Sequence, residues 1–309
     1  MQLEGIHHVT CITGDAPRNV EFYTGVLGLR LVAKSVNQDD PEVYHLFYAD
    51  ETGDPGGDIT FFEYRDTRRG RAGAGMVHTV VWRVASEAAI SFWERRLEAH
   101  DLAPWLEGKE LRFSDPEGLA HALVVSHAHD APLVARHPEI PPAMALQGFE
   151  GVRAFGARIE RSGALLEHVM GAKVLDAGVW ELRGSRRGGT ISFEHAPPER
   201  GIPGAGTVHH VAWGTTAAEH PKWLERLQEH GVASTPVIDR HYFHSIYFRE
   251  PGGVLYEIAD DAPGFTVDSP VEELGRRIIL PPQFEPYRPQ IEARLTPLPD
   301  PRAEWSGTP

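Results

Sequence analysis

The sequence predicts an α+β protein built from four copies of one module, in which a strand and a helix are followed by three more strands. Two recurrences support this prediction. The motif His-His-Val occurs in two apolar segments, at residues 7–9 and 209–211. The turn Asp-Pro-Glu-Gly at residues 115–118 is matched by Glu-Pro-Gly-Gly at 250–253, and each turn precedes a closing strand by the same distance. In addition, segments rich in β-branched residues alternate with segments of helical period.

The first module is predicted at residues 5–64. Its opening strand is followed by Asp15, a residue suited to cap a helix, and by an apolar stripe at helical spacing that ends at Gly28. The strands of this module are expected at residues 5–13, 30–35, 43–49 and 58–64.

The other three modules repeat this order. They are predicted at residues 75–126, 148–195 and 206–261. Their helices are expected at residues 86–100, 165–170 and 219–230.

The modules are expected to pair into two domains. Modules one and two form an N-terminal domain at residues 1–135, and modules three and four form a C-terminal domain at 146–262. Residues 128–145 contain several His and Pro residues and little periodicity, which is typical of a linker. Residues 263–309 are rich in Pro and predict an extended strap over the surface, with one short helix near 271–277.

Alignment of the four opening strands locates a candidate metal site. His-His-Val in modules one and four corresponds to His78-Thr79-Val80 in module two and to Glu150-Gly151-Val152 in module three. The second histidine is therefore present only in modules one and four. In the closing strands, Glu257 of module four aligns with Ala122 of module two. A metal site shared between modules one and four explains this pattern.

Strand geometry selects one histidine from each pair. Adjacent residues of a strand point to opposite faces, so both histidines of a pair cannot easily bind one ion. His210 shares its face with Ala212, which leaves room for a cavity, whereas His209 shares its face with Trp213, which fills a core. Two imidazoles and one carboxylate can hold a divalent iron ion and leave its opposite side open. The candidate ligands are His8, His210 and Glu257.

The sequence also contains a candidate for a fourth ligand. Glu63, in the segment Phe61-Phe62-Glu63, aligns with Glu257 and could bind the same ion. Module three has a similar pair, Phe193-Glu194, without a histidine, so Glu63 could equally be an ordinary residue at the end of a strand.

Composition and charge exclude several classes of protein. A formal net charge of −14 disfavours binding to nucleic acid or to an anionic membrane. No segment approaches the roughly 20 apolar residues of a membrane span, and the first residues do not resemble a secretion signal. The single cysteine, Cys11, cannot form an internal disulfide and suits a reducing compartment. We expect a cytoplasmic protein without nucleic-acid or membrane partners. Both a monomer and a homo-oligomer are compatible with the sequence.

The module pattern resembles the vicinal oxygen chelate superfamily, whose domains are of the glyoxalase/bleomycin-resistance type. Residues 5–10, 239–253 and 264–268 more narrowly resemble the hydroquinone-type ring-cleaving dioxygenases, which include the chlorohydroquinone 1,2-dioxygenases and the MhqO-like proteins. The resemblance covers about residues 5–298. It implies Fe(II), with Mn(II) as a substitute, held at the positions of the three candidate ligands. It also implies a small aromatic substrate and O2.

The same resemblance implies a polar environment around the metal. The residues that would form this environment are His7, Thr10, His209, Arg240 and Tyr247. The last three would steady the substrate oxygens and transfer protons. The alternatives are a surface salt bridge for Arg240 and a core aromatic side chain for Tyr247.

Two other functions compete with ring cleavage. A metal-dependent isomerase or lyase of the glyoxalase type would need Glu63 as a ligand and would consume no O2. A noncatalytic protein that binds small molecules or confers resistance is the third alternative, since one fold can host several functions. Catechols remain alternative substrates to hydroquinones.

Overall fold

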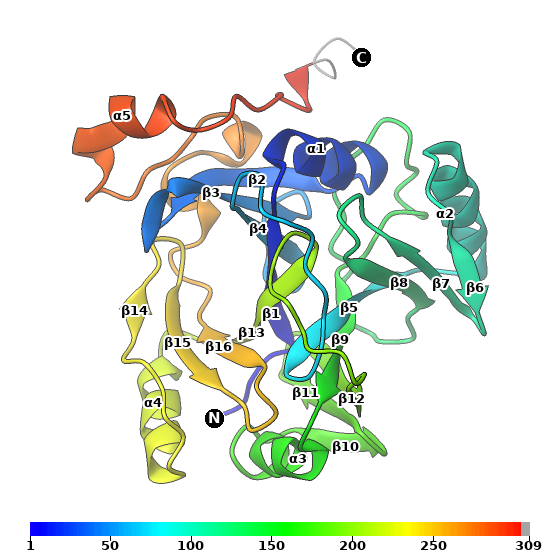
Figure 1. The fold of residues 1–309 in the computed structure, drawn as a ribbon, viewed down its shortest axis with the longest axis vertical. Coiled ribbons are helices and arrows are strands. Elements are labelled where there is room, and N and C mark those ends of the chain that lie inside the picture. The colour runs from blue at the N-terminus through cyan, green and yellow to red at the C-terminus, as the bar shows by residue number, and fades with distance from the viewer. Residues whose placement is uncertain (304–309) are drawn as a thin grey trace.

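The structure is a computed structural model that describes residues 1–303; the six residues after Ala303, which belong to the predicted strap, lie outside its described part. It contains two eight-stranded sheets with few helices (Figure 1). The predicted α+β class and the four repeated modules are confirmed. Within the described residues, no helix is long and apolar enough to cross a membrane.

Each module has the predicted order of elements. Module one comprises β1 (Ile6–Thr13), α1 (Ala16–Val20) with a π-helical continuation (Glu21–Val26), β2 (Arg30–Asn37), β3 (Asp40–Ala49) and β4 (Asp58–Glu63). Module two comprises β5 (Met76–Val84), α2 (Glu87–Ala99), β6 (Trp105–Glu107), β7 (Glu110–Ser114) and β8 (Ala120–Val125). Module three comprises β9 (Phe149–Gly156), α3 (Ile159–His168), β10 (Lys173–Asp176), β11 (Val179–Arg183) and β12 (Gly188–His195). Module four comprises β13 (Thr207–Gly214), α4 (His220–Glu229), β14 (Ile238–Asp239), β15 (His244–Arg249) and β16 (Leu255–Ala259).

Local signals account for the starts of α1 and α2. Asp15 caps α1 by accepting a hydrogen bond from the backbone N of Arg18 at 3.1 Å, and Ser86 caps α2 in the same way. The helix α3 begins six residues before its predicted start and has no side-chain cap that would have revealed the position. The helix expected near 271–277 is only a 3-10 turn, Val271–Glu273, because Leu274 leaves helical geometry with ψ 134° and Gly275 adopts a left-handed conformation with φ 75°.

The sheets join modules from opposite halves of the sequence. One sheet has the strand order β14-β15-β16-β13-β1-β4-β3-β2, so it combines modules four and one. The other has the order β10-β11-β12-β9-β5-β8-β7-β6 and combines modules three and two. We expected modules one and two to pair, and modules three and four, but each sheet crosses that division. The boundaries 1–135 and 146–262 stay predictions.

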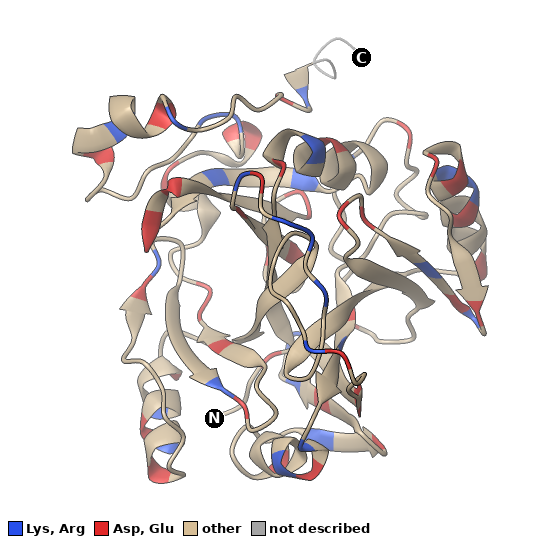
Figure 2. Cartoon of the chain, in the orientation of Figure 1, with Lys and Arg blue, Asp and Glu red and all other residues tan. Residues whose placement is uncertain are grey.

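The segment after module four lies over the β2–β3 edge of the first sheet (orange to red in Figure 1). It contains the 3-10 turns Phe265–Val267, Val271–Glu273 and Glu285–Tyr287 and the short helix α5 (Arg288–Glu292). The Tyr44 hydroxyl donates to the carbonyl oxygen of Thr296 at 3.0 Å, and Ile278 forms an isolated bridge to Lys34. Figure 2 shows acidic and basic residues interspersed over helices and loops, without a continuous patch of one sign in this view.

Each opening strand contains a β-bulge at the same module position. In the β1–β13 pair, Ile6 lies opposite Trp213 and His8 lies opposite Ala212, so His7 is an extra residue. His209 is the extra residue on β13. In the β5–β9 pair the extra residues are His78 and Glu150. These four residues are the ones that the alignment of opening strands placed together. The bulge is therefore a feature of the module, and it is present with or without metal ligands.

A buried polar network links module one to module two. The Tyr23 hydroxyl donates to Asp115 Oδ2 at 3.1 Å and lies 3.1 Å from His121 Nε2. The Trp82 indole donates to His121 Nδ1 at 3.1 Å. Burial raises the pKa of Asp115 to about 6. All four side chains are buried in the apolar core, so each depends on its partners for hydrogen bonding.

We expect Tyr23→Phe to lower the free energy of unfolding by about 1–3 kcal/mol, because Asp115 Oδ2 and His121 Nε2 each lose a partner away from water. Urea denaturation monitored by circular dichroism measures the change. Tyr64→Phe is the matched control, since the Tyr64 side chain is partly exposed and its hydroxyl makes only a 3.5 Å contact with Asn37. Equal stability of the two variants would contradict a stabilising role for the network.

Candidate metal centre

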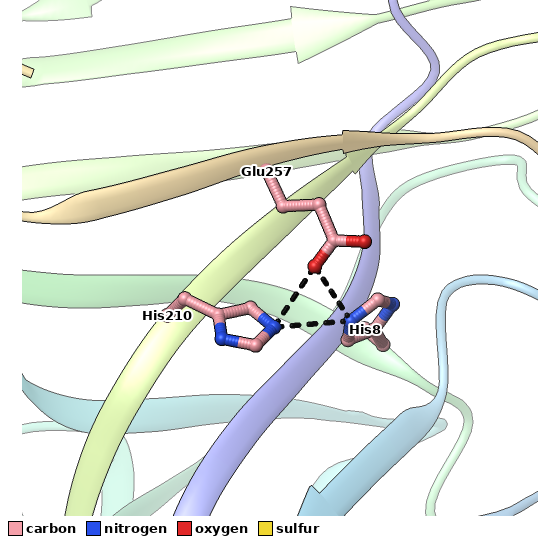
Figure 3. Close-up of side chains that lie close together, drawn as sticks. All are labelled: His8, His210 and Glu257. Atoms are coloured by element: carbon pink, nitrogen blue, oxygen red, sulfur yellow. Dashed lines mark hydrogen bonds and ion pairs between the residues drawn. The ribbon is translucent and has the colours of Figure 1, made fainter. Parts of the chain in front are cut away.

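Three candidate ligands meet at the centre of the first sheet. His8 lies on β1, His210 on β13 and Glu257 on β16, which are neighbouring strands (Figure 3). Glu257 Oε2 is 3.2 Å from His8 Nε2 and 2.9 Å from His210 Nε2, and the two Nε2 atoms are 3.4 Å apart. All three side chains are buried. Within residues 1–303, no other group of His, Cys, Asp or Glu has three ligand atoms this close together.

The geometry of these three side chains fits a divalent metal ion. Ligand atoms bound at about 2.1 Å in adjacent octahedral positions are roughly 3 Å apart, close to the separations found here. Glu257 Oε2 lies within ion-pair distance of both imidazoles but makes no hydrogen bond, which is expected if all three atoms face a common point. Burial raises the pKa of Glu257, but the His8 and His210 imidazoles outweigh it and hold that pKa well below its usual range. The carboxylate is therefore ionised, as a metal ligand must be.

The first histidine of each pair supports the second. His7 Nδ1 is 2.9 Å from His8 Nδ1, and His209 Nδ1 is 2.8 Å from His210 Nδ1. When Nε2 of His8 and of His210 binds a metal ion at the shared point, its lone pair is used there, so Nδ1 of each carries the proton and donates it. Nδ1 of His7 and of His209 then accepts. Such hydrogen bonds fix the tautomer and orientation of metal-binding imidazoles.

The structure corrects the expected position of His209. We expected it to share the core face with Trp213, but it is exposed and lines a cavity. The bulge turns the ring away from the face that strict alternation assigns to it. His7 differs from His209 because it is buried, and its Nε2 has no hydrogen-bond partner among the described residues. Burial lowers the pKa of His7 to about 3, which keeps it neutral.

The sheet register identifies the module-one equivalent of Glu257. Ala212 lies opposite Glu257 across β13–β16, and Thr10 lies opposite Thr60 across β1–β4. Because His8 and His210 are equivalent, Thr60 occupies the place of Glu257. The Thr60 hydroxyl donates to Thr10 Oγ1 at 2.8 Å.

Glu63 is therefore not a fourth ligand. Its alignment with Glu257 was wrong by three residues, and it lies opposite Thr13, on the other face of the sheet from Thr60. Its Oε1 accepts a hydrogen bond from the backbone N of Ala16 at 2.9 Å, at the start of α1. Sequence reasoning misplaced it because both closing strands contain a glutamate among apolar residues.

A cavity of about 480 Å³ lies next to the cluster, which is the size expected for a small-molecule site. Its apolar wall includes Phe47, Phe62, Phe243 and Leu255. Its polar wall includes His8, His45, His209, His210, Arg240 and Tyr247.

Arg240 and Tyr247 form one unit in the cavity wall. Arg240 Nε donates to the Tyr247 hydroxyl at 3.2 Å, and the guanidinium carbon lies 5.2 Å from the centre of the Tyr247 ring. Arg240 Nη2 is 3.1 Å from Asp39 Oδ2, which joins modules four and one beside the cavity. The Tyr247 ring is 5.7 Å from the His210 ring. Arg240 is thus more than a surface salt bridge, and Tyr247 is not a core residue.

Sequence reasoning missed Ser245 and His45. The Ser245 hydroxyl donates a short hydrogen bond to Glu257 Oε1, the carboxylate oxygen that faces away from the imidazoles. The signal was present, because Ser245 shares a strand face with Tyr247 and His45 shares one with Phe47. It was not decisive, since polar residues at alternate positions are common in strands.

Comparison with known proteins assigns the family. The family model of the Glyoxalase/Bleomycin resistance protein/Dioxygenase superfamily matches residues 5–120 and 149–258. The chain belongs to this superfamily. The two matched segments are the sequence halves that contain modules one and two and modules three and four.

Relatives within the superfamily cover nearly the whole chain. MhqO of Bacillus subtilis (strain 168), itself a predicted ring-cleaving dioxygenase, is 41% identical over 95% of this chain and 96% of its own. The chlorohydroquinone/hydroquinone 1,2-dioxygenase of Sphingobium indicum is 29% identical over 94% of this chain and 95% of its own. The crystal structure of a predicted dioxygenase from Bacillus subtilis subsp. subtilis str. 168 superposes with a TM-score of 0.90, at 38% identity, over 96% of this chain and 98% of its own.

We expect Glu257→Gln to abolish stoichiometric binding of a divalent metal, because the neutral amide is a far weaker ligand of nearly the same shape. The protein is loaded with Fe(II) under argon and gel-filtered, and inductively coupled plasma mass spectrometry then measures its metal content. Glu63→Gln is the matched control and should bind metal like the unmodified chain. A metal content near one per chain in Glu257→Gln would show that the carboxylate is not a ligand.

Proposed function

We propose that this protein is an Fe(II)-dependent dioxygenase that opens the ring of a substituted hydroquinone with O2, and that Mn(II) can replace the iron. The observation that carries the proposal is the one-sided cluster of His8, His210 and Glu257, which has no further protein donor at Thr60 and lies beside a partly apolar cavity. The named activity of the Sphingobium relative supports the same substrate class.

A ferrous ion with three protein ligands would lower the pKa of a phenol hydroxyl and keep positions open for that phenol and for O2 together. His8, His210 and Glu257 would hold it. Ser245 restrains the other carboxylate oxygen of Glu257, and His7 and His209 restrain the two imidazoles.

Three cavity residues are placed to act on the substrate oxygens. Tyr247 accepts from Arg240, so its own hydroxyl proton is free to be donated to a substrate oxygen. Arg240 stabilises negative charge that develops on such an oxygen. His209 accepts at Nδ1 and therefore carries its proton on Nε2, which can be donated into the cavity.

His7 and Thr10 act differently from these residues, because neither lines the cavity. His7 orients His8, and Thr10 orients the Thr60 hydroxyl. The two members of the His-His pattern that do not bind metal therefore have distinct roles. The His209 ring acts on the substrate, and the His7 ring acts on a ligand.

The apolar wall holds the aromatic ring. Phe47 and Phe62 come from module one and Leu255 from module four, so the cavity has an apolar contribution from both sides.

The glyoxalase-type isomerase is less well supported. A four-ligand centre needs a donor at the place of Thr60, and the hydroxyl there already takes part in hydrogen bonds with Thr10 and His45. A binding protein without catalysis would not need the proton donors Tyr247 and His209 beside an open metal position.

We expect the Fe(II)-loaded protein to consume one O2 for each hydroquinone ring opened and to stop under argon. An oxygen electrode, combined with mass spectrometry of the products, measures this stoichiometry with hydroquinone, 2-methylhydroquinone and catechol. Glu257→Gln provides the blank. Isomerisation of a thiol adduct under argon, without O2 uptake on any diol, would replace the dioxygenase with the isomerase.

A further inference from the structure

One polar side chain of the cavity, His45, is not used by the reaction described above. It lies on β3, and its imidazole lines the same cavity as His8 and His210. The ring lies against two phenyl groups, with its centre 3.9 Å from that of Phe47 and 4.4 Å from that of Phe62. This packing against Phe47 and Phe62 restricts the orientation of the imidazole.

The hydrogen bonds of His45 leave one ring nitrogen for a ligand. Nε2 lies 3.0 Å from Thr60 Oγ1, and Thr60 donates its own proton to Thr10. The Thr60 oxygen therefore accepts from Nε2–H, and Nδ1 carries a lone pair. No described residue bonds to Nδ1, and this atom is not sealed in the protein interior. An acceptor thus faces the cavity beside the rings of Phe47 and Phe62.

The repeat of modules shows where this acceptor lies relative to the metal centre. His45 pairs with Phe62 across β3–β4, as Ser245 pairs with Ala259 across β15–β16. His45 is therefore the module-one equivalent of Ser245. Ser245 bonds to Glu257, and His45 bonds to Thr60, the equivalent of Glu257. In module four, Ser245 completes the hydrogen bonding of the ligand Glu257. In module one, His45 keeps Nδ1 without a hydrogen-bond partner among the described residues, on the side of the centre that has no protein ligand.

The order of the strands indicates how far β3 lies from the strands that carry the metal ligands. Strand β3 is two strands from β1, so the backbones of these two strands lie about 10 Å apart. A hydroquinone held through one hydroxyl at the metal centre carries its second hydroxyl on the opposite ring carbon, on the side away from the metal. A catechol has both hydroxyls at the metal end and needs no partner there.

We propose that His45 is a substrate-binding residue whose Nδ1 accepts a hydrogen bond from the distal hydroxyl of an aromatic 1,4-diol, so that the cavity selects 1,4-diols over 1,2-diols. The proposal rests on the proposed function, because that function supplies the ring and its point of attachment. Phe47 and Phe62 hold the imidazole in place, and Thr60 sets its tautomer.

Binding to the Fe(II)-loaded protein under argon tests the proposal without turnover. Isothermal titration calorimetry compares hydroquinone with phenol, which lacks the distal hydroxyl. We expect His45→Phe to weaken hydroquinone binding about tenfold and to leave phenol binding within about twofold. His45→Gln restores an acceptor and should recover most of the difference. Metal content is measured for each variant, so that a loss of iron is not mistaken for a loss of the hydrogen bond.

His78→Phe is the matched control. The His78 imidazole is bonded to a threonine hydroxyl, Thr79 Oγ1 at 2.9 Å, and its centre lies 4.0 Å from that of Phe155, but it is on β5 of the second sheet. Both ligands should bind this variant as they bind the unmodified chain. An equal loss of both ligands in His45→Phe would reduce His45 to a residue that shapes the cavity, and no loss of either would exclude contact.

The two proposals can fail separately. Selective loss of hydroquinone binding in His45→Phe, together with no O2 uptake by the unmodified protein, would retain the 1,4-diol site and remove the dioxygenase. O2 uptake with ring opening, together with equal binding of hydroquinone by both proteins, would retain the dioxygenase and overturn the role of His45.

Discussion

The antiparallel pairing of β1 with β13 is the constraint on which the rest of the site depends. This contact brings the first strand of module one beside the first strand of module four, although about 200 residues separate them. It sets His8 and His210 on one face at a distance that a single ion can span. Shifting the register by one residue would turn one imidazole to the other face of the sheet. The cavity, the cluster and its hydrogen bonds follow from this pairing.

The bulges make a paired histidine useful on such a strand. In a regular strand, His7 and His209 would point into the core and could not reach their neighbours. The extra residue at each position bends the backbone so that Nδ1 of the first imidazole meets Nδ1 of the second. The same bulges at His78 and Glu150 accompany Thr79 and Gly151, which supply no ligand. The module therefore provides the backbone, and the side chain after the bulge decides whether metal can bind.

Much of this arrangement could be predicted from the sequence, because repetition makes small signals comparable. His8, His210 and Glu257 were identifiable because equivalent residues of other modules are Thr79, Gly151 and Ala122. Three features could not be predicted. Strict alternation misplaced His209, since a bulge leaves no mark in the sequence. An apolar strand with a terminal glutamate made Glu63 look equivalent to Glu257, and only the register showed that Thr60 takes that place. The pairing of modules one and four in one sheet depends on contacts far apart in sequence, which local patterns do not encode.

The separation of the ligands along the chain has a consequence for assembly. His8 is synthesised about 200 residues before His210 and almost 250 residues before Glu257. Until Glu257 has been made, the growing chain holds His8 without its full set of partner ligands, and a single imidazole captures metal only weakly. The complete set of donors forms after β13 and β16 have joined β1. The donor positions are thus fixed by a finished sheet, and an ion bound there would join module one to module four.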